Sequence, residues 1–351
     1  MATLQADDIL DLVQTTLDDL GRFNYTEIAS DIQDHVAWNQ LMNRERTVFG
    51  SGRGMTWEVM VNTSTAAKNT GLFEVDDVDV PDVFQKANVD WRHSTSNMAF
   101  DRREEEMNSG AARIVDLVAA RRTTAMISYA ELFENDFWTN PADSSNNLKM
   151  FGVPYWIVYN ATEGFNGSNP SGYTSGAGNL NSDTYTRWKN YTANFASISK
   201  DDLVKKMRKA SHFTRFMAPN KSNPSTFNTG DRYGYYASYA IVSGLEELLE
   251  AQNQNLGVDV ASMDKRTLFR GNPVIWAPIL ENKDSEVVYG INWGVFKIAF
   301  LRGEILRQTG PMPAPLQHNV INVHWDSTTQ VICRDRRRNF VIADGDPGED
   351  V

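Results

Sequence analysis

The sequence predicts an α+β protein in which a long β-hairpin and a long helix precede a mixed lobe, followed by a closing β-segment. Three patterns lead to this prediction. Apolar residues alternate on both sides of a polar stretch within Met55–Phe100, and they recur at helical spacing within Arg102–Trp138. They also flank a polar cluster within Gln317–Ala343. Alternation is typical of strands, and a spacing of three or four residues is typical of helices.

The composition limits the functional classes. The chain has 351 residues, of which 41% are hydrophobic and 23% charged, as expected for a globular protein with a sizeable core. Its net charge of -11 argues against a dedicated nucleic-acid binder, which would show a broad basic surface. The single cysteine, Cys333, excludes an internal disulfide. No signal peptide and no membrane-spanning run are expected.

The N-terminal region is predicted to begin with an amphipathic helix over Asp7–Leu20, which packs either on its own core or on a neighbouring molecule. A glycine-rich stretch follows, in which Gly50, Gly52 and Gly54 are predicted to form a hinge. It lacks the Gly-Lys-Ser/Thr ending of a phosphate-binding loop, so a nucleotide site is not expected there.

The next region is predicted to be a long two-stranded excursion. Trp57, Val59 and Val61 alternate on its first strand, residues 62–70 form a polar tip, and the chain returns towards Phe100. A hairpin with so little local core is only marginally stable alone, so we expect it to pack on another surface, such as another subunit.

A single helix is predicted over Arg102–Trp138. At about 1.5 Å per residue it would be roughly 50 Å long. Few compact enzymes contain so long a central helix. A helix of this length is expected in an elongated subunit that forms part of a shell.

The lobe that follows is predicted to mix helices and strands. The expected elements are strands over 151–159, 272–280 and 287–292, a polar surface loop over 163–181, and helices that start at 199 and span 239–254. Leu203, Met207 and Ala210 are predicted to form the buried face of the first of these helices.

The closing segment is predicted to be a β-hairpin whose turn is the polar run Asp326–Thr329. It carries Arg334, Arg336, Arg337 and Arg338. One reading is that these arginines are exposed and solvated, and that they discourage edge-to-edge pairing. The functional hypothesis is that they contact acidic residues in the long hairpin of a neighbouring subunit, namely Glu74, Asp76, Asp77 and Asp79.

The sequence predicts no catalytic, cofactor-binding or metal-binding residues, and therefore no enzyme. The five histidines show no zinc-ligand spacing, and no Gly-x-Ser-x-Gly nucleophile motif is present. The clustered tyrosines Tyr233, Tyr235, Tyr236 and Tyr239 are expected to pack at a junction between a sheet and a helix. Such a chain is expected to act by contacting copies of itself.

The order of these elements resembles the major capsid protein of tailed bacteriophages, which has the HK97-type fold. The resemblance is carried by the hairpin Met55–Phe100, the helix Arg102–Trp138, the segment Phe269–Val274 and the closing block Val320–Ala343 with Trp325. It spans nearly the whole chain. It implies an N-terminal arm (1–48), an E-loop (49–100), a spine helix of the P-domain (101–144), an A-domain (145–312) and a closing P-domain segment with the C-terminal tail (313–351).

The resemblance also implies a function. Hexamers and pentamers would close an icosahedral shell around double-stranded DNA, assembled in the host cytoplasm and found in the virion. The implied partners are other copies of the chain, a separate scaffolding protein, a portal and decoration proteins, with neither sequence-specific DNA binding nor a membrane. Two alternatives stay open: an encapsulin-like compartment shell, and, from another class, a carbohydrate-active enzyme or binding module that uses the aromatic residues.

Overall fold

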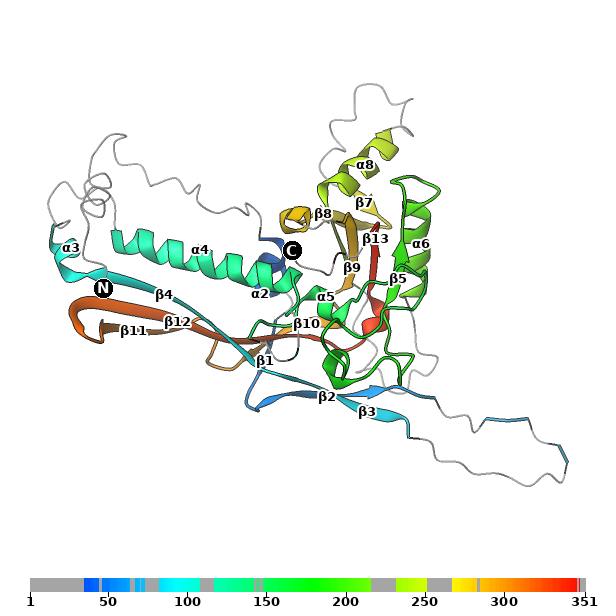
Figure 1. Ribbon diagram of the computed structural model, residues 1–351, viewed down its shortest axis with the longest axis horizontal. Helices are drawn as coiled ribbons and strands as arrows, with labels where there is room; N and C mark the ends of the chain where they lie inside the picture. Colours follow the sequence, from blue (N-terminus) through cyan, green and yellow to red (C-terminus); the bar gives the residue numbers. More distant parts are fainter. Residues whose placement is uncertain are drawn as a thin grey trace.

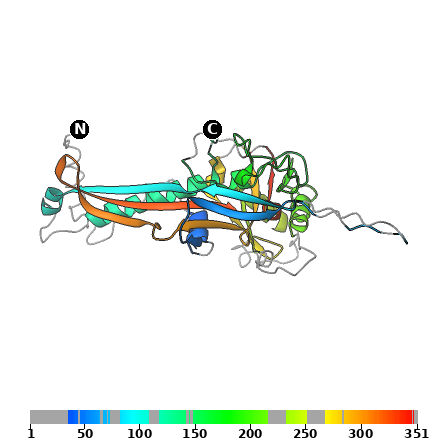
Figure 2. The same cartoon turned by 90° about the horizontal axis from the view of Figure 1, so that it is seen from below.

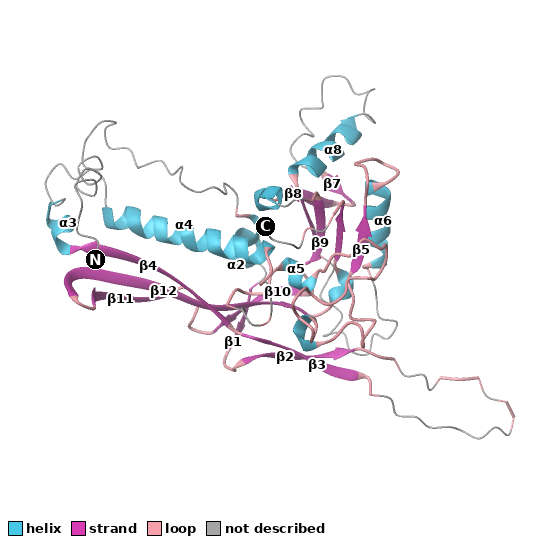
Figure 3. Cartoon of the chain, viewed as in Figure 1, coloured by secondary structure: helices cyan, strands magenta, loops and turns pink. Residues whose placement is uncertain are grey.

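In the computed structural model, the described residues are 35–43, 46–63, 67–69, 71–72, 82–107, 117–141, 144, 148–215, 232–250, 267–282, 285–345 and 347. They form an elongated arm and a lobe that stands beside one end of it (Figures 1 and 3). The predicted helix over 7–20 lies outside the described residues, as do Glu74, Asp76, Asp77 and Asp79.

The arm is built on a five-stranded sheet. Its strands are β1 (Arg46–Phe49), β4 (Arg92–Asp101), β10 (Phe296–Leu301), β11 (Arg307–Ala314) and β12 (Gln317–Cys333). The long strand β12 pairs antiparallel with β4 along one edge and with β11 and then β10 along the other. Seen from below, β4 and β12 run side by side along the arm (Figure 2).

Helices cover one face of this sheet. They are α2 (Val36–Asn43), α3 (Arg102–Met107) and α4 (Leu117–Trp138). A small cluster of Ala125 from α4 with Val323 and Trp325 from β12 joins helix to sheet. The sequence predicted one helix over 102–138. The structure gives two helices in this range, and residues 108–116 between them lie outside the described part.

The lobe contains a six-stranded sheet in the order β5-β13-β9-β6-β8-β7. Its strands are β5 (Tyr191–Asn194), β6 (Tyr233–Ala237), β7 (Leu268–Phe269), β8 (Asn272–Trp276), β9 (Val287–Asn292) and β13 (Phe340–Ala343). The accompanying helices are α5 (Val153–Trp156), α6 (Leu203–Phe213), α8 (Tyr239–Glu250), η1 (Ala177–Asn179), η2 (Pro278–Asn282) and η3 (Arg336–Arg338). As predicted, α6 buries Leu203, Met207 and Ala210.

A two-stranded sheet of β2 (Gly54–Met60) and β3 (Phe84–Asp90) lies below the lobe (Figure 1). Met55 pairs with Val89, and Met60 pairs with Phe84. The predicted hairpin is therefore confirmed for β2 and β3, but its predicted return as far as Phe100 is wrong. Beyond Trp91 the chain continues as β4, which pairs with β12 in the arm.

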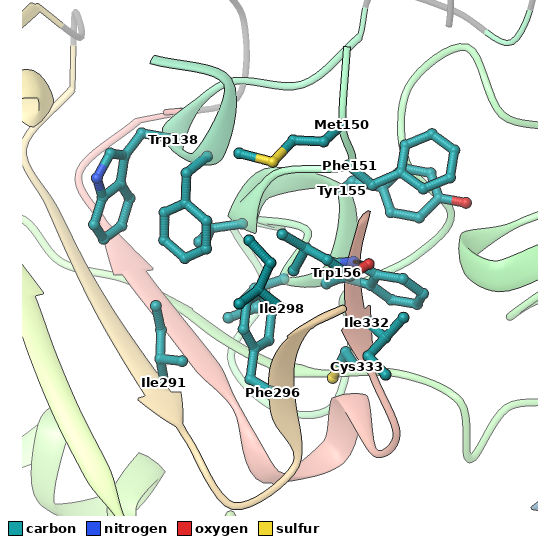
Figure 4. Close-up of a cluster of buried hydrophobic side chains, with 14 of the residues drawn as sticks. Trp138, Met150, Phe151, Tyr155, Trp156, Ile291, Phe296, Ile298, Ile332 and Cys333 are labelled. Atoms are coloured by element: carbon teal, nitrogen blue, oxygen red, sulfur yellow. Dashed lines mark hydrogen bonds between the residues drawn. The ribbon is translucent and has the colours of Figure 1, made fainter. Parts of the chain in front are cut away.

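One large hydrophobic core joins the lobe, the hairpin and the inner end of the arm. Figure 4 shows its centre, where Trp156, Phe296 and Ile332 converge from separate parts of the chain. All three side chains are almost completely buried. Burial of apolar surface is the dominant favourable term in folding, and aromatic side chains bury some of the largest areas.

Three sequence predictions fail in the lobe. The run 272–280 was predicted to be a strand, but β8 ends at Trp276 and η2 begins at Pro278. The run 151–159 was predicted to be a strand, but it contains the short buried helix α5. The stretch 163–181 was predicted to be too polar to pack, yet Tyr173, Ala177 and Leu180 within it are buried. Hydrogen bonds from Trp188 Nε1 to Ala177 O (3.0 Å) and from Gly178 N to the Tyr155 hydroxyl (3.0 Å) fix this stretch in the core.

The closing hairpin is also placed differently from the prediction. Asp326–Thr329 is not a turn, because β12 runs through it without interruption. The hairpin partner of β12 is β11, and Pro315 and Leu316 form the turn between them. Three of its four polar residues, Ser327, Thr328 and Thr329, are buried. Ser327 Oγ accepts from Leu306 N (3.0 Å), and Thr328 Oγ1 lies 2.9 Å from His93 Nδ1.

Candidate functional site

The β2–β3 hairpin has two different faces. Its inner face packs on the lobe: Ala87 and Val89 are buried, and the rings of Trp57 and Trp156 lie 6.0 Å apart. Its outer face exposes the cross-strand pair Met60 and Phe84, which are 48% and 60% exposed. An exposed apolar pair on a protruding hairpin is a feature of protein interfaces.

The predicted hinge residues lie where the chain enters this hairpin. Gly52 has a φ of +130°, which favours glycine, and its carbonyl accepts a hydrogen bond from Trp91 Nε1 (3.0 Å). Gly54 lies inside β2, where an added Cβ would lie 2.7 Å from Val89 O. Gly50 has open space around it. A bend at 50–53 is therefore present, and its use as a hinge stays a prediction.

The arginine run does not lie exposed on a strand, as the sequence suggested. It forms the short helix η3, in which Arg336 is fully buried and Arg338 is 4% exposed. Burial lowers the pKa of Arg336 to about 10, against 12.5 for an exposed guanidinium, because the charged form loses hydration. Arg336 is therefore an internal residue and cannot contact a neighbouring subunit.

Arg336 holds together three segments of the lobe. Its Nε donates to Trp156 O (2.7 Å), Nη1 to Trp188 O (3.0 Å), and Nη2 to Ser168 O (2.9 Å) and Asn190 Oδ1 (3.2 Å). The guanidinium fork thus satisfies backbone carbonyls that the irregular chain leaves without strand partners. Arg338 lies 3.4 Å from Asp335.

The rest of the run is more accessible. Arg334 is exposed, and Arg337 is half-buried with its guanidinium 4.2 Å from the centre of the Phe165 ring. The hypothesis of contact with a neighbour's acidic hairpin therefore applies only to Arg334 and Arg337. Its acidic partners lie outside the described residues.

A buried carboxylate that no sequence pattern singled out fixes helix α2 on the arm. Glu134 on α4 is 1% exposed and accepts hydrogen bonds from Ala37 N (3.1 Å), Trp38 N (3.0 Å) and Trp138 Nε1 (2.8 Å). Burial raises the pKa of Glu134, and these three donors oppose that rise. The first turn of α2 is thus capped by a residue almost a hundred positions away in the sequence.

The described residues contain no group of three or more potential metal-ligating side chains. No helix among them is long and apolar enough to cross a bilayer. The clustered tyrosines Tyr233, Tyr235 and Tyr236 lie in β6 and are buried, and Tyr239 begins α8. This is the predicted junction between a sheet and a helix.

Comparison with solved structures identifies the fold. A chain of the cyanophage A-1(L) capsid asymmetric unit superposes with a TM-score of 0.65 at 12% identity, over 92% of this chain and 96% of that one. The cyanophage Pam1 capsid asymmetric unit gives 0.56 at 11% identity, over 99% and 100%. The capsid of the Myoviridae phage XM1 gives 0.56 at 8% identity, over 97% and 99%.

No protein-family model matches the chain, and a search of curated proteins finds no match either. The chain nevertheless has the fold of these phage capsid proteins over almost its entire length. The resemblance noted from the order of sequence elements is thereby confirmed for the fold. At these identities the likeness concerns fold alone, so the function follows as a proposal.

Proposed function

We propose that this protein is the major capsid protein of a tailed bacteriophage. Copies of it assemble as hexamers and pentamers into an icosahedral shell that encloses double-stranded DNA. The observation that carries the proposal is the correspondence with chains from several phage capsids along more than nine-tenths of both partners. Unrelated proteins can share a small site, but here the similarity extends over the whole elongated chain. This supports a common structural role for this protein and those capsid proteins.

The shape of the subunit supports this role. The arm and the β2–β3 hairpin both extend away from the lobe (Figures 1 and 2). They provide surface on which neighbouring subunits can pack. We assign residues 49–100 as the E-loop, 101–144 and 313–351 as the P-domain, 145–312 as the A-domain and 1–48 as the N-terminal arm. In such a shell, many individually weak contacts add up to a stable container.

The charge of the chain fits a container wall. A net charge of -11 repels packaged DNA from the wall instead of trapping it. We therefore propose that DNA is enclosed without sequence-specific contacts. The other proposed partners are a scaffolding protein, a portal and decoration proteins. The role is structural and not catalytic, and the subunit assembles in the host cytoplasm before it becomes part of the virion.

The test is electron microscopy of the purified protein, combined with light scattering across a range of protein and salt concentrations. We expect closed shells, or rings of five and six subunits. Added salt should increase assembly, because it screens repulsion between acidic subunits. A chain that stays a monodisperse monomer under all these conditions, and also when produced with the neighbouring phage genes, would contradict the proposal.

A further inference from the structure

Helix α6 carries positive charge over its whole exposed side. Its sequence includes four Lys or Arg and no Asp or Glu. Leu203, Met207 and Ala210 are buried. The exposed residues of the helix are Lys205, Arg208, Lys209, His212 and Phe213. Residues three or four positions apart lie side by side on a helix, so the charged groups form one continuous strip. Figure 1 shows α6 on the side of the lobe that faces away from the arm.

The positive charge continues around the helix. Residues 187–215 contain eight Lys or Arg and two Asp or Glu, although acidic residues outnumber basic ones by 45 to 34 in the whole chain. Arg270, in the turn between β7 and β8, is exposed and donates from Nη1 to Ser211 Oγ on α6 (2.6 Å). Its φ of +51° lies in the left-handed region, which is uncommon for arginine. An arginine is therefore kept beside α6 at a position where its backbone is strained.

Aromatic rings connect α6 to the arginine run of η3. The ring of Phe213 lies 6.4 Å from that of Phe165, and the guanidinium of Arg337 lies 4.2 Å from the centre of the Phe165 ring. Burial and the nearby positive charge of Arg187 lower the pKa of Arg337. Two guanidinium groups that repel each other are stabilised by an anion placed near both. We refer to the exposed side of α6 with Arg187, Arg270 and Arg337 as the basic face.

Several charges of the basic face have no acidic partner within the subunit. Asp202 and Glu163 already pair with lysines of α6. In contrast, Arg187, Lys205 and Arg208 form no ion pair within the part of the chain that the structure describes. Cations that are held close together without acidic partners repel one another, and a bound polyanion removes this repulsion. The basic face therefore has capacity left for an anionic partner.

The composition of the basic face favours a nucleic acid over a protein as this partner. Protein–protein interfaces are depleted of lysine and have an uncharged, apolar centre. Phe213, at 53% exposure, is the only exposed apolar side chain within α6. Protein–DNA interfaces are much more positively charged than protein–protein interfaces, and arginine and lysine supply most of their phosphate contacts. The basic face matches the second kind of interface.

We propose that the basic face binds the phosphate backbone of double-stranded DNA without reading its sequence. This inference rests on the proposed function for the choice of DNA, and it names the surface of the subunit that meets the DNA. Arg187 and Arg337 hold one phosphate between them, and Lys205 and Arg208 contact others along the backbone. The chain as a whole is acidic and repels DNA, so the basic face determines which side of the lobe is turned towards it.

The test is the binding of a short fluorescent DNA duplex to the unassembled subunit at several salt concentrations, measured by fluorescence anisotropy. The double variant Lys205→Gln with Arg208→Gln should bind roughly tenfold more weakly at low salt, and its slope of log affinity against log salt should fall by about 1.8. The control is Arg53→Gln with Arg122→Gln, which removes the same charge from exposed positions outside the basic face. It should leave the slope unchanged. Equal losses in the two double variants would overturn the basic face, because only net charge would then matter.

A second measurement tests the contact inside the particle. Lys205 should react at least about threefold more slowly with an acetylating reagent in DNA-filled particles than in empty ones, because phosphates cover its amine. Lys86, which is exposed on β3, should react equally in both. The extent of reaction at each lysine is read by peptide mass spectrometry. Equal reactivity of Lys205 in filled and empty particles would overturn the contact.

Failure of this inference is distinguishable from failure of the proposed function. Normal particles from a subunit that does not bind the duplex would overturn the basic face as a DNA surface and nothing else. Tighter binding of poly-L-glutamate than of a duplex of equal charge would also overturn it, and would assign the face to an acidic protein. Absence of particles from the wild type would overturn the proposed function, whereas duplex binding, which is measured on the unassembled subunit, would still decide the role of the basic face.

Discussion

The two halves of β12 show how differently the inner and the outer ends of the arm are stabilised. From Ser327 to Cys333 every residue of the strand is buried, and polar side chains such as Gln330 are bonded to distant backbone groups. From Gln317 to Asn322 no residue is buried. The same strand is therefore fully buried in its C-terminal half and partly exposed to solvent in its N-terminal half. The inner end of the arm shares the core of the lobe, whereas the outer arm has surface left over for neighbours.

The largest expected effect lies in the lobe. Arg336→Ala removes a buried guanidinium and leaves the carbonyls of Trp156, Ser168 and Trp188 without donors. We expect a loss of about 3–5 kcal/mol in the free energy of unfolding, measured by chemical denaturation of the unassembled subunit. Arg334→Ala, at an exposed position in the same run, should change it by less than about 0.5 kcal/mol. Equal effects of the two substitutions would show that the network around Arg336 does not stabilise the lobe.

A smaller and more local effect is expected in the arm. Trp325→Ala removes the largest member of the small cluster with Val323 and Ala125. The loss should be about 3 kcal/mol, at the lower end for a buried tryptophan, because a thin cluster can collapse around the gap. Hydrogen exchange should accelerate in β4, β11 and the outer half of β12 while β9 and β13 stay protected. Acceleration throughout both sheets would mean that arm and lobe unfold as one unit.

The smallest of the three effects depends on pH and concerns Asp136, near the C-terminal end of α4. Burial raises the pKa of Asp136 from 3.8 to about 6, and Lys149 only partly opposes this. Because the folded state holds the proton more tightly, the subunit is penalised as pH rises from about 4 to about 6, and the penalty stays constant above that range. Asp136→Asn should therefore raise the free energy of unfolding at pH 8 by on the order of 2 kcal/mol.

The control for Asp136→Asn is the same comparison at pH 3.5, where the Asp136 carboxyl is protonated in the folded state and mostly protonated in the unfolded state, so the two proteins should differ by only a few tenths of a kcal/mol. If the variant were less stable than the wild type at pH 8, the ionised carboxylate would have to be stabilised in the fold. The aspartate would then be part of the structure that supports the arm, and not a group whose burial costs stability.

Local sequence patterns determined much of the fold. The alternation of Trp57 and Val59 in one strand and of Val89 in the other indicated the hairpin, and the periodicity of Leu203, Met207 and Ala210 indicated α6. These predictions succeeded because each pattern reports which side of a single element meets the core. The order of elements along the chain was sufficient to indicate the fold class.

Only the tertiary structure decided which polar residues are buried and which are exposed. The run Asp326–Thr329 has the composition of a turn, but it stays in a strand because Leu306, His93 and Glu304 satisfy its groups from elsewhere in the chain. The arginine run has the composition of an exposed edge, but Arg336 is buried because carbonyls from three distant segments surround it. A buried polar group is stable only when its partners are in place. Those partners are set by long-range packing, which a local pattern does not encode.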